Sequence, residues 1–197
     1  MGRTKTVSDE AVLKAARDIF VEKGYGSSTR EIARRAGISE AVLYQRYRTK
    51  LDLFFAAMIP PPLDLAERRG GGSGQDFAAE LDGLALEIMA YFRNAMPVLL
   101  QLVTHPSFNM AELVDRETRL PLHRLGQAVA ECIERQRGIT ADADRVQAAT
   151  LTLLATLHSL ALFEHMGIHG GSFPDQAVKN IVNLIAAGLT AKKGIRP

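Results

Sequence analysis

The sequence has little cysteine and lacks the motifs of several protein classes. Its one cysteine, Cys132, excludes an internal disulfide and gives no support to a thiolate metal site. No Gly-rich phosphate loop, nucleophile elbow or paired acid-base motif is present, which argues against an enzyme. The five histidines show neither E-x-x-H nor H-E-x-x-H spacing. We therefore expect no metal and no other cofactor.

Long apolar runs and strand signals are also missing. The N-terminus has no apolar segment of the kind found in signal peptides, and no uninterrupted run of about 18 apolar residues occurs. Neither strands nor hairpin turns are indicated. The 197 residues, 47% of them hydrophobic, suffice for one large or two small folded domains. We expect a soluble, cytoplasmic, all-α protein without a membrane partner.

Charge is distributed unevenly along the chain. The formal net charge is +2, but residues 1–50 contain eleven Lys and Arg against six Asp and Glu. The remainder contains thirteen basic and sixteen acidic residues, so the first quarter has net charge +5 and the rest −3. A basic N-terminal region is typical of a domain that binds DNA. Arg3 and Lys5 extend this basic region into a short arm that could reach the DNA backbone or minor groove.

Residues 28–50 have the pattern of two short helices joined by a tight turn. Ser28 and Glu31 have the spacing of a capping box, in which each side chain binds a backbone N–H of the first turn. Gly37 supplies the residue that takes a positive φ just after a helix, and Ser39 can cap the next one. The apolar positions of the first helix are Ile32, Ala33 and Ala36.

The second of these helices has an apolar and a polar face. Leu43 and Tyr47 lie one turn apart and are predicted to point inward. Residues 40, 41, 44, 45 and 48 then form the outer face, which is polar and basic. This arrangement indicates a helix-turn-helix over about residues 28–47, with the second helix in the major groove of DNA.

The same stretch resembles a known family. Leu43-Tyr44-Gln45-Arg46-Tyr47, followed by Thr49-Lys50 and Leu53, is similar to the recognition helix and following segment of TetR/AcrR-type transcriptional regulators. Arg46 replaces the histidine that is usual in that family, and the spacing from Gly24 to Ile32 is one residue shorter than in many members. The resemblance covers roughly residues 7–58. Upstream, the matching positions are Ala15, Ala16, Phe20, Gly24 and Tyr25.

Specific roles follow for the outer residues. Arg30 can bind guanine through two hydrogen bonds, and an Arg at the matching place in the family can read a base. Gln45 suits adenine and Glu40 suits a cytosine amino group, whereas Tyr44 and Lys50 suit phosphate. The alternative for each is an ordinary solvated side chain without a DNA contact. The full predicted DNA-binding set is Thr29, Arg30, Ser39, Glu40, Ala41, Val42, Tyr44, Gln45, Arg46 and Lys50.

Further helices surround this motif. Ser8 is predicted to cap a first helix, and Thr49 with Asp52 a fourth that runs over residues 50–59. We place a DNA-binding domain at 1–58, a linker at 59–75 and a helical regulatory and dimerisation domain at 76–197. Within the last domain, Pro97 predicts a helix break or the start of a new helix, and Pro121 a kink or split.

The two C-terminal helices are the most apolar of the chain, and helices apolar on nearly every side must be covered on every side. We therefore expect a homodimer through them, as the resemblance also implies, that binds a palindromic operator. The resemblance further implies a repressor released by a small ligand, for which we expect an apolar or aromatic compound. The predicted pocket residues, each also suited to plain core, are Tyr91, Phe92, Met96, Leu99, Phe108, Met110, His123, His158 and Phe163.

Two alternatives remain open at this point. A regulator of the same fold could lack a small-molecule ligand and act constitutively or through a protein partner. An enzyme with an appended DNA-binding domain is disfavoured by the missing catalytic motifs.

Overall fold

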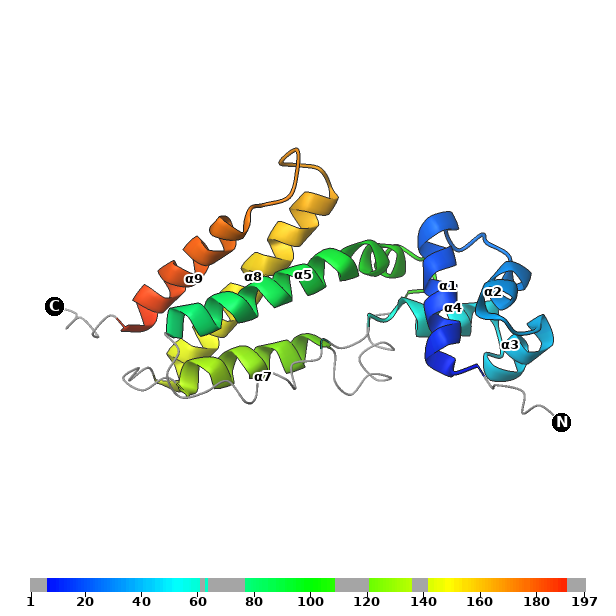
Figure 1. The fold of residues 1–197 in the computed structure, drawn as a ribbon, viewed down its shortest axis with the longest axis horizontal. Helices are drawn as coiled ribbons and strands as arrows, with labels where there is room; N and C mark the ends of the chain where they lie inside the picture. The colour runs from blue at the N-terminus through cyan, green and yellow to red at the C-terminus, as the bar shows by residue number, and fades with distance from the viewer. Residues whose placement is uncertain (1–6, 61–62, 64–76, 109–120, 136–141, 191–197) are drawn as a thin grey trace. The chain divides into compact units, whose positions relative to one another are not determined.

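A computed structural model describes residues 7–60, 63, 77–108, 121–135 and 142–190. All regular secondary structure within these ranges is helical, which confirms the all-α prediction (Figure 1). The helices are α1 (Asp9–Lys23), α2 (Thr29–Ala36), α3 (Glu40–Arg46), α4 (Lys50–Met58), α5 (Phe77–Val103), α7 (Pro121–Glu134), α8 (Ala143–His165) and α9 (Asp175–Thr190).

The chain divides into two compact units. We call the first the head unit, which comprises Met1–Pro60 and Pro97–Asn109, and the second the bundle unit, which comprises Pro61–Met96 and Met110–Pro197. Helix α5 contributes residues to both units, because the division falls at Pro97. The final turns of α5 are therefore part of the fold of the N-terminal helices.

The head unit has a closed hydrophobic core. Helix α1 inserts Val12, Ile19 and Phe20, none of which is exposed. Phe20 makes an edge-to-face contact with Phe54 of α4, with ring centroids 5.1 Å apart. The end of α5 completes this core. Its contribution consists of Val98 and Leu102.

Capping residues define most helix ends in the head unit. The side chains of Ser8 and Ser39 accept hydrogen bonds from backbone N–H groups at the start of α1 and α3. Thr49 and Asp52 form the predicted capping box of α4. The box predicted at Ser28 is wrong, because Ser28 precedes α2 without a side-chain hydrogen bond. Its expected partner Glu31 accepts a hydrogen bond from the Lys23 ammonium instead, at 2.6 Å.

The break predicted at Pro97 is also wrong. Helix α5 continues through this residue to Val103. A proline inside a helix removes one backbone hydrogen bond and crowds the preceding turn. Here the neighbouring residues Met96 and Val98 are both buried, so packing on either side holds the helix together despite that loss. The kink or split predicted at Pro121 concerns residues 109–120, which lie outside the described ranges, and α7 begins at Pro121.

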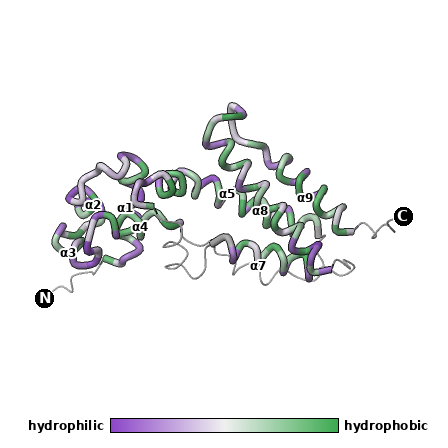
Figure 2. Tube along the Cα trace, turned by 180° about the vertical axis from the view of Figure 1, so that it is seen from behind, coloured by the Kyte–Doolittle hydropathy of each residue, from purple (hydrophilic) through white to green (hydrophobic). Residues whose placement is uncertain are grey.

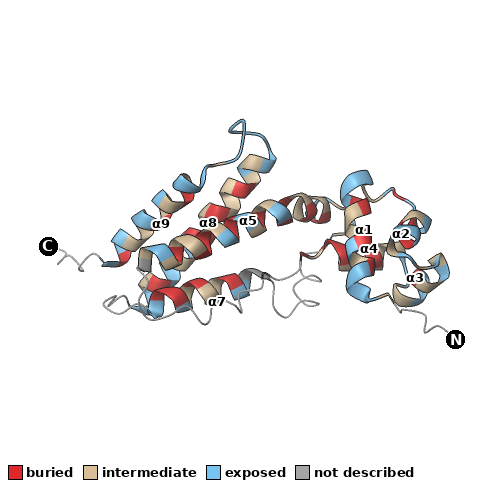
Figure 3. Ribbon diagram, in the orientation of Figure 1, coloured by how far each residue is buried: buried red, intermediate tan, exposed pale blue. Residues whose placement is uncertain are grey.

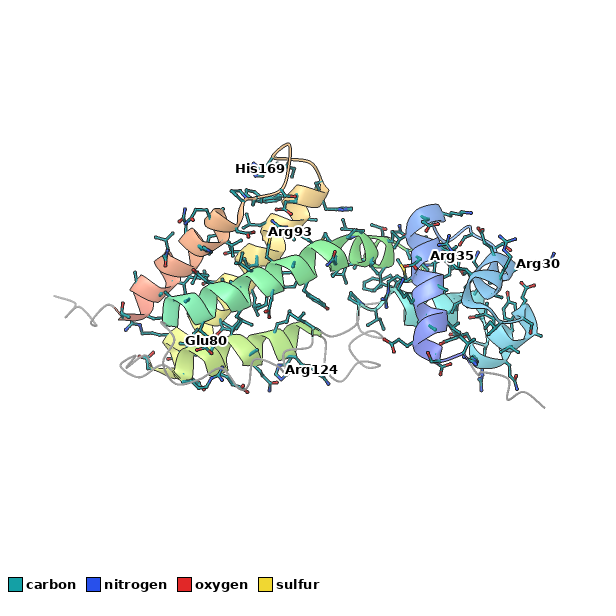
Figure 4. The ribbon with its side chains drawn as sticks, in the orientation of Figure 1. Arg30, Arg35, Glu80, Arg93, Arg124 and His169 are labelled. Carbon is teal, nitrogen blue, oxygen red and sulfur yellow. The ribbon has the colours of Figure 1, made fainter. Side chains whose placement is uncertain are left out.

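An ion pair joins distant parts of the bundle unit. The Arg93 guanidinium on α5 donates two hydrogen bonds to the Glu164 carboxylate near the end of α8, both at 2.8 Å (Figure 4). Arg93 also donates to the Phe173 carbonyl, and the Phe173 N–H donates to Glu164. The hydrogen bonds from Arg93 hold the pKa of Glu164 below its ordinary value. This cluster fixes the segment between α8 and α9 to α5.

Helix α8 is apolar along much of its length. Figure 2 shows hydrophobic residues along α5 and α8. By length and composition alone α8 could cross a membrane, but buried helices of soluble proteins meet the same criteria. Only 28% of its most apolar stretch is buried within this chain. Leu151 and Phe163 are the large apolar residues of α8 that are exposed.

Candidate nucleic-acid interface

A glycine turn and a small core set the arrangement of α2 and α3. Gly37 adopts φ 73°, a left-handed conformation that suits glycine. The N–H of Ile38 donates to the Ala33 carbonyl across the turn at 3.0 Å. Ile32 on α2 and Leu43 on α3 are buried in the head core. The two helices therefore form a helix-turn-helix whose inner faces are fixed by packing.

The outer face of this motif is exposed as the pattern predicts. Figure 3 shows exposed residues on α2 and α3, and Figure 4 labels Arg30 on α2. The side chain of Arg30 is 87% exposed, and Tyr44 is 42% exposed. Ala41 and Gln45 are also exposed, whereas Val42 is only partly so. A guanidinium, a phenol, an amide and small apolar groups are the chemical types that contact DNA bases and phosphates.

Hydrogen bonds join the first residues of α2 and α3. The hydroxyl of Thr29, a residue only 8% exposed, donates to the Glu40 carboxylate at 2.7 Å. The Tyr44 hydroxyl lies 3.2 Å from the Thr29 hydroxyl. Arg30 completes the cluster, with its Nε 3.6 Å from the second Glu40 oxygen. Thr29 thus contacts both Glu40 and Tyr44, two other predicted DNA contacts, which the sequence did not indicate.

Two further residues that are predicted to contact DNA interact with other residues of the chain. Arg46 donates to the Val7 carbonyl at 2.8 Å and to the Asp9 carboxylate at 2.9 Å. Its guanidinium therefore ties α3 to the start of α1. The Lys50 ammonium lies 4.6 Å from the centroid of the Tyr25 ring, in a cation–π contact.

Other basic residues of α2 are paired with carboxylates. Arg35 makes two hydrogen bonds to Glu22, and these hold the pKa of Glu22 below its ordinary value. Glu31 lies 4.0 Å from Arg34, and its pKa is lowered mainly by the hydrogen bond from Lys23. Arg34 and Arg35 are therefore both paired with carboxylates of the head unit itself.

Some positioning residues had no signal in the sequence. The Arg17 guanidinium on α1 donates to the Ala57 and Ile59 carbonyls at the end of α4, at 2.7 and 3.0 Å. His105, which follows α5, packs its ring against Tyr25 and Phe54, with centroids 4.5 and 4.9 Å away. Both contacts join residues far apart in the chain, so only the folded structure reveals them.

The predicted ligand-pocket residues divide into several groups. Phe92 and Met96 are buried, and Phe92 contacts the ring of His158 edge to face at 5.4 Å. Tyr91 lies beside Phe92, at 5.8 Å between ring centroids. His123 and Phe163 are exposed. Leu99 and Phe108 belong to the head unit, and Met110 lies outside the described residues.

Comparisons with known proteins agree with this geometry. Residues 12–57 match the family described as bacterial regulatory proteins, tetR family. The chain is 46% identical over 48 residues to the HTH-type transcriptional activator FasR of Mycolicibacterium smegmatis. It is 41% identical over 59 residues to the uncharacterised HTH-type transcriptional regulator YezE of Bacillus subtilis. These segments cover 24% and 29% of this chain, and 22% and 30% of the two relatives.

The fold of the whole chain also has a solved counterpart. A transcriptional regulator from a Rhodococcus species superposes with a TM-score of 0.65, at 23% sequence identity, over 94% of this chain and all of that one. At this identity the likeness concerns the fold, which comprises an N-terminal helix-turn-helix domain and a C-terminal helical domain. The N-terminal domain is therefore of the tetR type, since residues 12–57 match that family and the same region is similar to two HTH-type regulators.

Proposed function

We propose that the chain is a homodimeric transcriptional repressor that binds a palindromic operator and is released by a small apolar or aromatic ligand. The observation that carries the DNA-binding part is the outer face of the helix-turn-helix in a domain that matches the tetR family. That face presents the exposed side chains of Arg30, Tyr44 and Gln45. In this proposal Arg30 reads guanine, Gln45 reads adenine, and Tyr44 and Lys50 bind phosphate.

The proposal of a homodimer rests on exposed apolar residues in the bundle unit. Leu151 on α8 is 67% exposed and Leu184 on α9 is 75% exposed. A second copy of the chain would bury both, and a symmetric dimer presents two heads to two half-sites. Isolated exposed leucines are common on soluble proteins. Here they lie on the two helices for which the sequence predicts a dimer interface.

Release by a ligand requires different affinity for two states of the protein. A ligand acts on DNA binding only if it favours the arrangement of heads that mismatches the half-sites. Helix α5 has residues in both units, since Met96 belongs to the bundle unit and Leu102 to the core of the head unit. A ligand that shifts α5 in the bundle unit would therefore disturb the packing of the head.

The sign of regulation depends on where the operator lies relative to the promoter. The relative FasR is named an activator. Repression is proposed here because a dimer that occupies an operator blocks polymerase without needing any further surface. Reporter expression with the operator placed over or upstream of a promoter distinguishes the two signs.

Selection of bound duplexes from a random DNA pool, at a stated salt concentration, tests the DNA-binding proposal. Wild type should select a palindromic consensus, and Arg30→Ala should relax it at one base pair in each half-site. Selection without any consensus, equally weak for both proteins, would contradict the proposal. The variant Arg34→Ala, which removes a neighbouring arginine not assigned to a base, serves as the matched control.

A thermal-shift panel of apolar and aromatic compounds tests the ligand proposal. A compound that binds the folded protein should raise the melting temperature, and the same compound should lower operator affinity. A regulator that is constitutive or controlled by a protein partner would show neither effect with any compound of the panel.

A further inference from the structure

The carboxylate of Glu40 lies at the centre of a cluster of polar side chains on the proposed DNA-binding face. Thr29 donates to one of its oxygens at 2.7 Å, and Arg30 lies 3.6 Å from the other. The Tyr44 hydroxyl reaches the same group through Thr29, at 3.2 Å. The Glu40 carboxylate thus holds Thr29 and Arg30 directly and Tyr44 through Thr29, and all three are predicted to contact DNA.

Counting protons gives the direction of these hydrogen bonds. Thr29 has one hydroxyl proton, and an ionised carboxylate only accepts. Thr29 donates this proton to the Glu40 carboxylate. The hydrogen bond between Thr29 and Tyr44 is therefore donated by the Tyr44 hydroxyl to the Thr29 oxygen. In this arrangement the Tyr44 proton is not available to a phosphate, which also only accepts. Tyr44 and Thr29 can donate to DNA only after leaving the Glu40 cluster.

We propose that Glu40 sets the discrimination between operator and other DNA. On a random sequence, phosphates must draw Arg30 away from Glu40 and Tyr44 away from Thr29, and the Glu40 carboxylate is then left near phosphates of the same charge. At the operator, a cytosine amino group in the major groove donates to this carboxylate and replaces the donor it has lost. Glu40 therefore lowers the affinity of the protein mainly for DNA sites that lack such a base pair.

The exposure of the cluster suits this role. The side chain of Glu40 is 34% exposed and that of Arg30 is 87% exposed, so their ion pair is weak and can exchange partners. Thr29 is nearly buried and fixes the position of the carboxylate at the start of α3. Glu40 is thus held at a defined place on the reading helix while its second oxygen faces exposed groups.

The test compares two duplexes and three proteins, and it rests on the proposed function. Fluorescence anisotropy measures the affinity for the operator selected by wild type and for a random duplex of the same length, at several salt concentrations. The proteins are wild type, Glu40→Gln and Glu31→Gln. Glu31→Gln removes the same charge from the same motif, but its carboxylate pairs with Lys23 and Arg34 outside the cluster.

Glu40→Gln should bind the random duplex about tenfold more tightly and lower the ratio of operator to random affinity by a similar factor, the usual size of one base-pair discrimination. Selection repeated with this variant should relax one base pair in each half-site. Glu31→Gln should leave the ratio unchanged. Equal thermal melting of the variants and wild type shows that the fold is retained.

Two results would overturn the inference while leaving the proposed function intact. One is equal tightening of Glu40→Gln on both duplexes, which is a general effect of charge. The other is unchanged binding to random DNA. Wild type that does not prefer its selected duplex over random DNA would instead overturn the proposed function, and this inference with it.

Discussion

The head unit and the bundle unit differ in how far their large apolar side chains are buried. In the head unit the buried apolar side chains form one core, and polar side chains cap the starts of α1, α3 and α4. Among the described residues of the bundle unit, Leu151, Met166, Ile168 and Leu184 are more than half exposed, whereas the exposed Val21 and Val103 of the head unit reach only 36% and 43%. A surface of arginine, tyrosine and glutamine suits DNA, whereas an apolar surface suits another protein surface. The difference is the one that the proposed function requires, with DNA at the head unit and a second copy at the bundle unit.

The largest expected effect comes from a charge placed on the apolar surface of the bundle unit. Leu184→Glu should weaken the proposed dimer by about 3 kcal/mol, roughly a hundredfold in its dissociation constant, because a buried unpaired carboxylate is costly. Sedimentation equilibrium measures the constant. Asn183→Glu adds the same charge at the adjacent exposed position and should have a much smaller effect. Equal behaviour of the two variants would show that α9 is not at the interface.

The next effect tests whether the end of α5 belongs to the head core. Leu102→Ala should lower the free energy of unfolding of the head unit by about 3 kcal/mol, as for other buried leucines. Hydrogen exchange of amides in α1 and α4 reports this loss. The adjacent Val103 is 43% exposed, so Val103→Ala should change stability by less than about 0.5 kcal/mol. Unchanged exchange in Leu102→Ala would mean that the head folds without α5.

A smaller effect concerns the ion pair of the bundle unit. Glu164→Gln should cost about 2 kcal/mol at neutral pH, because it weakens hydrogen bonds to the Arg93 guanidinium. The pKa of Glu164 is lowered in the folded protein, mainly by those hydrogen bonds. Its stabilisation is therefore complete above the ordinary carboxyl pKa and is lost as the pH falls through the lowered value.

Denaturant unfolding measured from neutral to acidic pH checks this linkage. The difference between wild type and Glu164→Gln should shrink as Glu164 becomes protonated. Glu131→Gln, on the exposed side of α7, should differ little from wild type at any pH. A difference that stayed constant with pH would assign the effect of Glu164 to packing.

The smallest effect compares two helix starts in the head unit. Thr49→Ala removes a formed capping box and should cost about 1 kcal/mol. Ser28→Ala removes a hydroxyl that makes no capping hydrogen bond, so it should cost only a few tenths of that. Thermal unfolding of the two variants measures both losses of stability. A larger loss for Ser28→Ala than for Thr49→Ala would mean that Ser28, and not Thr49, is the stabilising cap.

Local features of the fold could be predicted from the sequence because they depend on residues a few positions apart. The caps at Ser8, Ser39 and Thr49 and the turn at Gly37 are of this kind. The capping box at Ser28 failed although its spacing was right, because Glu31 has a competing partner in Lys23. The low helix propensity of Pro97 was likewise overridden by the packing of its buried neighbours, and α5 continues through it.

Contacts between distant residues could not be predicted from one sequence. The hydrogen bond from Thr29 to Glu40 depends on the angle between α2 and α3, and the pair of Arg93 and Glu164 spans 71 positions. The place of α5 in the head core is a third example. The sequence could therefore nominate residues of the DNA-binding face by type, but not show that Thr29 contacts both Glu40 and Tyr44.

The most direct test of the central claim is the stoichiometry of the complex with the selected duplex. Sedimentation or mass measurement should find two chains on a duplex with both half-sites, and a duplex with one half-site should bind far more weakly. One chain bound with equal affinity to the whole and the halved duplex would contradict a dimeric regulator of a palindromic operator.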